Sequence, residues 1–229
     1  MLGTLVNVTA IIVGSLAGLI FKGRISEKYN KTIVQAISLG VILIGLKSAF
    51  KCDDFILIVI SLAFGSLLGE ICKIECRLEN TGKLLEKKFS KKSKSSFATG
   101  FVTTTLLYCV GAMAIVGSLE SGLTGNHATL FAKSTIDGIM AIIFASTMGI
   151  GVLFSSVSVL VYQGSITLAA AYIKPFLTPE VIAQTSSIGG LLIVALGINM
   201  LGNNKIKVGN MLPCVFIPLF YYIGMQIFK

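Results

Sequence analysis

Charge is what this sequence has least of. Only 13% of its 229 residues are charged, whereas 54% are apolar and the mean hydropathy is +0.88. A soluble domain carries about a quarter charged residues, so a soluble enzyme is excluded. Apolar stretches of about 17 to 23 residues recur along the chain, each long enough to cross roughly 30 Å of hydrocarbon as a helix. We predict an all-α protein, a polytopic bundle of transmembrane helices.

Residues that bind metals or carry catalysis are also scarce. The chain has one histidine, His127, and five cysteines. The pair Cys72 and Cys76 has no second histidine to complete a zinc site, and the cysteine spacing suggests no disulfide framework. An intramembrane enzyme needs a clustered nucleophile and base or metal ligands. We therefore expect no enzymatic activity, no metal and no cofactor.

The net charge is +9. The basic residues do not form an arginine-rich or aromatic-interleaved domain, which excludes a nucleic-acid partner. The charge instead follows membrane topology. Basic residues gather in the loop around residues 22–31 and in residues 73–94, and the positive-inside rule places both segments in the cytoplasm. Loop alternation then puts both termini outside. Residues 1–10 lack a positive region and a cleavage site, so they are expected to begin the first span and not a signal peptide.

Eight apolar segments are expected to be membrane spans. They cover residues 3–21, 33–50, 55–69, 97–119, 138–154, 157–173, 181–201 and 208–228. The third is short, and only Ser155 and Ser156 separate the fifth from the sixth. We expect one of these segments to be re-entrant or broken.

Residues 70–96 form the one long polar stretch, with a basic amphipathic pattern. Its lysines are expected to bind the anionic inner leaflet, and the four that lie closest together are Lys87, Lys88, Lys91 and Lys92. Two functions stay open for this segment. It is either a topology determinant and surface anchor, or a regulatory helix that binds lipid or a partner.

Two parts of the chain resemble each other. Residues 25–44 match residues 177–193, which pairs Gln35 with Gln184 and places Asn7 near the position equivalent to Gln163. The loop charges orient the two parts oppositely, so the repeat is inverted, as in many transporters. We divide the single membrane domain (1–229) into a first repeat (1–69), the basic segment (70–96), central spans (97–154) and a second repeat (157–229). A competing match of residues 10–18 with 141–149 pairs spans one and five in the same orientation.

Polar residues within the spans are the candidate site residues, because hydrocarbon penalises them. Asn7, Gln35, Gln163 and Gln184 are expected to converge on one solute, although each amide could instead hold helices together.

A second group follows the fourth span, where Ser118, Glu120 and Asp137 could line an ion pathway. Lys133 and Asp137, four residues apart, could instead form an ion pair at a helix entrance. Gly14-x3-Gly18 and Gly65-x3-Gly69 allow close helix contact, either within the chain or in a homodimer.

Several motifs together resemble the YqgA/YdfK-like family of bacterial integral membrane proteins. They are GTLVN at 3–7, FKGRI at 21–25, CVGAMAI at 109–115, FASTMGIG at 144–151 and YQGS at 162–165. The resemblance covers nearly the whole chain. It implies a location in the bacterial cell (inner) membrane but does not identify a substrate, because the family is known chiefly as a domain of unknown function.

Two functions remain. The repeat and the paired amides favour a transporter or channel for a small ion or solute, with its site between the repeat helices. The alternative is a membrane scaffold or sensor that acts through the cytoplasmic basic helix.

Overall fold

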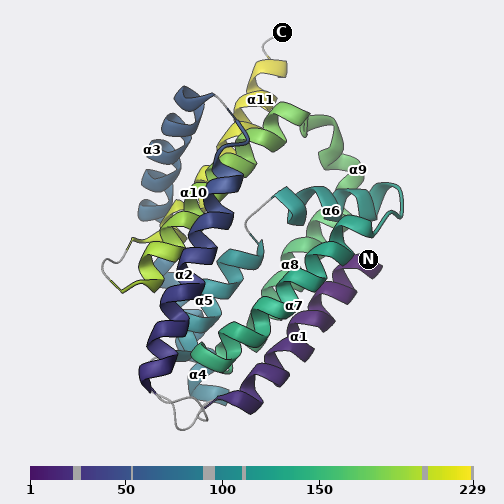
Figure 1. Cartoon of the computed structure of the whole chain (residues 1–229). Coiled ribbons are helices and arrows are strands. Elements are labelled where there is room, and N and C mark those ends of the chain that lie inside the picture. The colour runs from purple at the N-terminus through teal and green to yellow at the C-terminus, as the bar shows by residue number, and fades with distance from the viewer. Residues whose placement is uncertain (23–26, 53, 90–95, 110–111, 203–205, 228–229) are drawn as a thin grey trace. The chain divides into compact units, whose positions relative to one another are not determined.

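The computed structural model describes residues 1–22, 27–52, 54–89, 96–109, 112–202 and 206–227 (Figure 1). In those ranges every regular element is a helix. Among the described residues, seven helices are long and apolar enough to cross a membrane, and one bent pair brings the number of spans to as many as eight. The prediction of an all-α polytopic bundle is confirmed.

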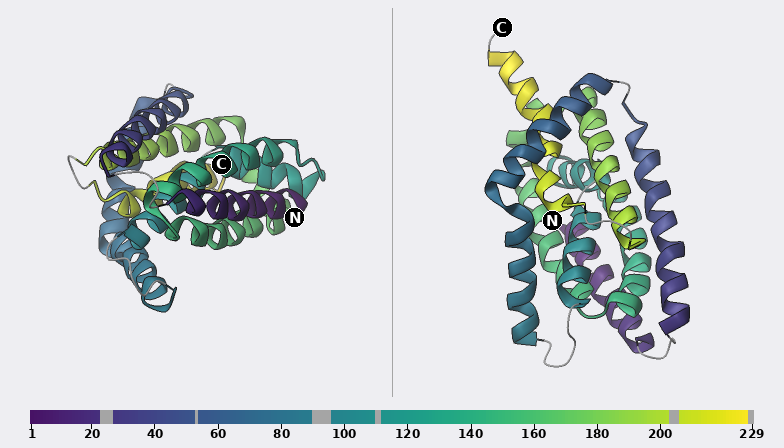
Figure 2. Two further views of the ribbon diagram at one scale, coloured as in Figure 1. Left: turned by 60° about the horizontal axis from the view of Figure 1, so that its bottom comes forward. Right: turned by 90° about the vertical axis from the view of Figure 1, so that its left-hand side faces the viewer.

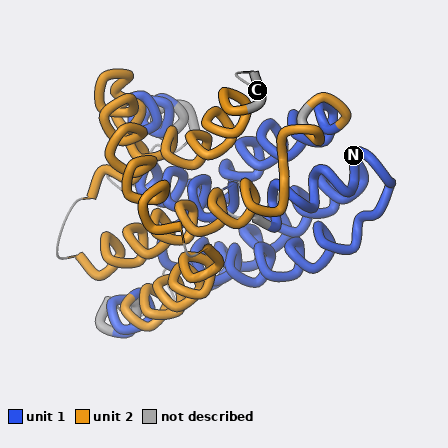
Figure 3. Tube along the Cα trace, turned by 90° about the horizontal axis from the view of Figure 1, so that it is seen from above, with its two compact units in different colours: residues 1–34, 77–109, 113–170 blue, residues 35–76, 110–112, 171–229 orange. Residues whose placement is uncertain are grey.

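The helices follow one another in this order: α1 (Leu2–Phe21), α2 (Glu27–Ala49), α3 (Phe55–Cys72), α4 (Ile74–Phe89), α5 (Ser96–Cys109), α6 (Ala112–Leu123), α7 (Ala128–Met148), α8 (Gly151–Leu168), α9 (Ala170–Ile173), the 3₁₀ helix η1 (Lys174–Phe176), α10 (Pro179–Met200), the 3₁₀ helix η2 (Val208–Phe216) and α11 (Ile217–Ile227). They form two compact units (Figure 3). Unit 1 holds residues 1–34, 77–109 and 113–170, and unit 2 holds residues 35–76, 110–112 and 171–229.

Small residues set the packing of α1 against α7 in unit 1 (Figure 1). A Cβ atom at Gly14 would overlap the carbonyl oxygen of Gly138, and one at Gly18 would overlap that of Ile142. The contacts advance in the same direction along both helices, so α1 and α7 are parallel. The first of the two glycine motifs therefore serves contact within the chain.

The third helix of this group, α8, runs antiparallel to α1. Thr4 lies 3.4 Å from Thr167 between hydroxyl oxygens, and Asn7 contacts Gln163 one turn further along α1. The chain reverses between α7 and α8 at Gly149, whose φ of 86° lies in the region that favours glycine.

Unit 2 contains two more antiparallel pairs. In α2 and α10 (Figure 2), a Cβ at Gly45 would lie 2.7 Å from the carbonyl oxygen of Gly190, and a Cβ at Gly197 would lie 3.0 Å from that of Ser38. In α3 and η2, Gly65 faces Cys214 and Gly69 faces Asn210. The second glycine motif also serves contact within the chain.

Two helices of unit 2, α3 and α10, begin at residues whose side chains cap the first turn. The Asp54 carboxylate accepts a hydrogen bond from the backbone N–H of Leu57 (3.1 Å) at the start of α3. The Thr178 hydroxyl accepts one from Val181 (3.3 Å), with Pro179 in the first turn of α10. Both are N-caps, which satisfy N–H groups that the helix itself leaves unpaired.

The expected re-entrant or broken segment is present, but it is none of the segments that the sequence singled out. The third span is an unbroken helix, α3. The fifth and sixth meet at Gly149, because Ser155 and Ser156 lie inside α8 and bond their own helix at 2.6 Å. The re-entrant or broken segment is the fourth, in which residues 97–109 and 113–123 form helices bent by 59°.

An inverted repeat requires equivalent helices to run in opposite directions. The three proposed pairs, α1 with α8, α2 with α10 and α3 with η2, each do so within their own unit. The competing match pairs α1 with α7, which are parallel. The inverted repeat and the four-part division of the domain remain predictions.

Candidate functional site

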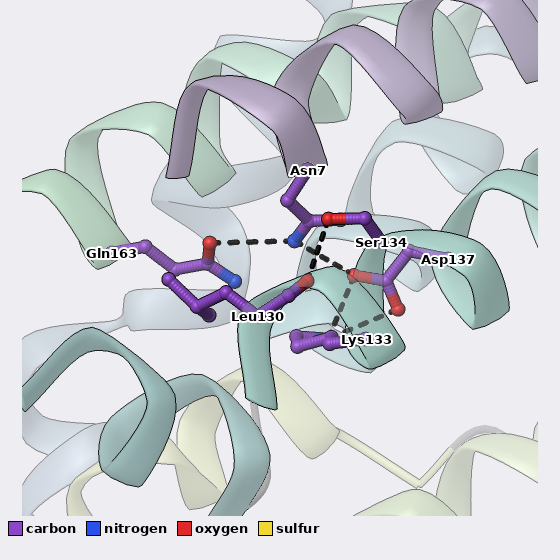
Figure 4. Close-up of polar contacts among 6 residues, drawn as sticks. All are labelled: Asn7, Leu130, Lys133, Ser134, Asp137 and Gln163. Atoms are coloured by element: carbon purple, nitrogen blue, oxygen red, sulfur yellow. Dashed lines mark hydrogen bonds and ion pairs between the residues drawn. The ribbon is translucent and has the colours of Figure 1, made fainter. Parts of the chain in front are cut away.

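Two buried amides meet inside unit 1 (Figure 4). The Nδ2 of Asn7 on α1 donates to Oε1 of Gln163 on α8 at 3.3 Å and to Oδ2 of Asp137 on α7 at 3.0 Å. Asn7 and Gln163 have no solvent-exposed side-chain area, and Asp137 is 5% exposed. One amide group thus joins three helices.

The carboxylate of Asp137 also forms an ion pair with Lys133. The Lys133 ammonium lies 2.9 Å from Oδ1 and 2.7 Å from Oδ2. Residues four apart share one face of a helix, so α7 presents both charges together. We call Asn7, Lys133, Asp137 and Gln163 the polar cluster, and its formal net charge is zero.

The sequence placed Lys133 and Asp137 before a span that starts at Gly138. The helix begins ten residues earlier, at Ala128, and the ion pair therefore lies within α7 and not at its entrance. The mutual neutralisation of the two charges explains why an apolar helix can contain them.

Two atoms of the polar cluster have no hydrogen-bond partner in the part of the chain that the structure describes. They are Oδ1 of Asn7 and Nε2 of Gln163. Leaving a buried donor or acceptor unpaired costs about 1–3 kcal/mol. The phenol oxygen of Tyr108 on α5 is also buried and has no partner in the described residues. The polar cluster therefore has hydrogen-bonding capacity that the protein itself does not use.

The other two predicted amides belong to unit 2. Gln35 is exposed on α2, and Gln184 on α10 donates to Asp54 at 3.5 Å. Of the four predicted amides, the structure thus brings Asn7 and Gln163 into contact, and Asp137 contacts Asn7 as well. Convergence of all four amides on one solute remains a prediction.

The second predicted group consists of Ser118, Glu120 and Asp137, and each of them has different surroundings. Glu120 accepts a 2.6 Å hydrogen bond from the hydroxyl of Thr129, and His127 contacts Ser121 at 3.0 Å, so both hold the connection between α6 and α7. Ser118 on α6 is buried, with a hydroxyl that has no partner among the described residues. Asp137 has the partners given above, and an ion pathway through Ser118, Glu120 and Asp137 remains a prediction.

The structure does not describe the side chains of the four lysines expected at the lipid surface. Lys91 and Lys92 lie outside the described residues, and the side chains of Lys87 and Lys88 at the end of α4 do as well. Their binding to anionic lipid therefore remains a prediction.

Sequence reasoning missed a polar contact in unit 2. Asn210 in η2 donates to Glu70 (2.6 Å) and accepts from the backbone N–H of Glu75 (2.7 Å), while Lys207 donates to Glu70 at 2.7 Å. The hydrogen bond to Glu70 raises the pKa of Lys207. These bonds tie the end of α3 and the start of α4 to η2. An asparagine just after a basic loop and inside an apolar span was the available signal.

In the described ranges, no group of three or more histidine, cysteine, aspartate or glutamate side chains lies close enough together to hold a metal ion.

Comparison with known proteins identifies relatives along almost the whole length. Residues 2–223 match the family described as "Protein of unknown function (DUF554)". The chain is 35% identical over 222 residues to "Uncharacterized membrane protein YdfK" of Bacillus subtilis (strain 168), and 31% identical over 222 residues to "Uncharacterized protein YqgA" of Escherichia coli (strain K12). Each alignment covers 95% of this chain and 94% of the relative. No solved structure matches.

Proposed function

The chain belongs to the DUF554 family, and we propose that this multi-pass membrane protein is a transporter or channel for a small ion or solute. Its site is the polar cluster of α1, α7 and α8. The observation that carries the proposal is a buried ion pair joined to two amides, of which two polar atoms are unpaired.

Ionisable side chains within membrane helices are costly, and where they occur they commonly mark ion or substrate pathways. A structural role alone accounts less well for the polar cluster, because interhelical hydrogen bonds in membranes contribute only about 0.6 kcal/mol on average. The unpaired atoms of Asn7 and Gln163 add a cost that a bound solute would remove.

The helices that hold the polar cluster also fit a transporter. Asn7 lies on α1 and Gln163 on α8, the first helices of the two proposed repeats, and these run antiparallel. Transporters with inverted repeats place their sites where the repeats meet. We further propose the bacterial inner membrane as its location, with both termini outside, on the basis of the loop charges.

The test is a flux assay with the purified full chain in liposomes. Monovalent cations, small anions, neutral amides and amino acids are screened against protein-free liposomes. We expect at least one class to cross faster with the protein, and Asn7→Leu to remove that flux. Ser165→Leu is the matched control, because Ser165 is exposed on α8 and bonds only its own helix. Flux of none of these classes would overturn the proposal and favour the membrane scaffold or sensor.

A further inference from the structure

We propose that the polar cluster takes a small uncharged solute that carries a hydrogen-bond donor and an acceptor on neighbouring atoms, the chemistry of urea and of primary amides. This inference rests on the proposed transport function and names the class of solute.

Charge neutrality is the first reason. Lys133 and Asp137 neutralise each other at 2.7 and 2.9 Å. Oδ1 of Asp137 already bonds Lys133, and Oδ2 bonds both Lys133 and Asn7. Both carboxylate oxygens thus already have a partner, and the cluster carries no net charge that would attract an ion of either sign.

The ligand set is the second reason. A hard cation requires several oxygen ligands, and Oδ1 of Asn7 is the one amide oxygen of the polar cluster without a partner. An anion would need several donors, and the amide nitrogen of Gln163 is the one side-chain nitrogen there without a partner. In the described residues, the polar cluster thus has one acceptor atom and one donor atom with no partner at all.

The arrangement of these two groups is the third reason. The amides of Asn7 and Gln163 are joined at 3.3 Å (Figure 4), so the free acceptor and the free donor belong to adjacent amides. A solute with an N–H group beside a carbonyl oxygen can bond both at once.

The experiment measures the shrinkage and re-swelling of proteoliposomes containing the full chain, after mixing with urea or with acetamide. Influx of ²²Na⁺, ⁸⁶Rb⁺ and ³⁶Cl⁻ is measured on the same preparations. We expect the protein to raise urea or acetamide permeability above that of protein-free liposomes and to leave ion influx unchanged.

Gln163→Glu is the decisive variant, because it keeps the side-chain length and replaces the free N–H donor with an acceptor. We expect it to lower solute permeability by about tenfold, as for the loss of one hydrogen bond in a buried site. Ser165→Leu should retain the wild-type permeability. If Gln163→Glu does not purify as a single species, Gln163→Met removes the same donor without adding charge and carries the same expectation.

The outcomes separate the two proposals. Ion influx without urea or acetamide permeation would overturn the inference and leave transport standing. Unchanged solute permeability in the Gln163 variant would also overturn it. Permeation of neither solutes nor ions would overturn the inference together with the proposed function.

Discussion

Asn7 on α1 donates a hydrogen bond to Gln163 on α8, although 156 positions of sequence separate them. The same nitrogen also donates to Asp137 on α7. Asn7 therefore connects the first helix of the chain to the hairpin of α7 and α8, which lies much further along the sequence. It joins the two amides that the proposed repeat pairs with each other, and it lies beside a buried ion pair.

The ion pair should matter for stability only when it is broken on one side. Lys133→Met leaves the Asp137 carboxylate buried and unpaired, which we expect to lower the free energy of unfolding by about 3–5 kcal/mol. The double variant Lys133→Met/Asp137→Leu should recover most of that loss, because two apolar side chains replace two charges. Denaturant unfolding in detergent measures both.

Lys83→Met is the control for that experiment. It breaks an ion pair with the same spacing, to Glu79 at 3.8 Å, whose side chains are 60% and 44% exposed. We expect a change within about 1 kcal/mol. A double variant as unstable as Lys133→Met would contradict this view of the pair.

The sequence predicted the class of fold and most spans, because length and hydropathy alone decide whether a helix can cross a bilayer. It misplaced the start of α7 since hydropathy treats Lys133 and Asp137 as two separate charges, whereas the helix pairs them. It also took Ser155 and Ser156 for a break. Hydroxyls that bond their own backbone are tolerated inside helices, and the actual reversal needed the positive φ of Gly149.

The candidate site was predictable in part for a similar reason. The apparent repeat paired Asn7 with Gln163, and their contact is present. The hydrogen bond between Asn7 and Asp137 depends on the side-by-side packing of α1 and α7 through Gly14 and Gly18. Such packing between distant segments leaves no periodic signal that identifies the partner helix, and the same holds for Asn210 with Glu70.

Close packing of α1 on α7 gives the second prediction. Gly14→Val would push side-chain atoms into the backbone at Gly138, and we expect it to lower the free energy of unfolding by about 1–3 kcal/mol or more. Gly40→Val is the matched control, because nothing lies within 4 Å of a Cβ there. Equal unfolding midpoints for the two variants would show that the helices do not depend on this contact.

Loop charges give a third prediction, on topology. In a cysteine-free background, a cysteine at Lys88 should react with a membrane-impermeant thiol reagent only from the cytoplasmic side. A cysteine at Asp54 should react only from outside. Labelling of both from one side would be incompatible with the proposed orientation and with inversion of the repeat.

The basic segment gives a fourth prediction. Replacing Lys87, Lys88, Lys91 and Lys92 with glutamine in the full chain should weaken its attraction to anionic lipid, by roughly 1 kcal/mol for each basic residue near the surface. A fluorophore on the segment, with the protein in nanodiscs, reports its contact with the membrane. The wild type should respond to added phosphatidylglycerol and the variant should not. Equal responses would disprove the surface-anchor role.

The most direct test of the polar cluster as a transport site is the flux of Gln163→Leu in proteoliposomes. We choose from the wild-type screen the solute that crosses fastest, and we measure unfolding of the same purified samples. The account predicts that flux falls to the protein-free level while the free energy of unfolding changes by less than about 1 kcal/mol, and that Ser165→Leu transports normally. Wild-type flux through a stably folded Gln163→Leu protein would contradict it.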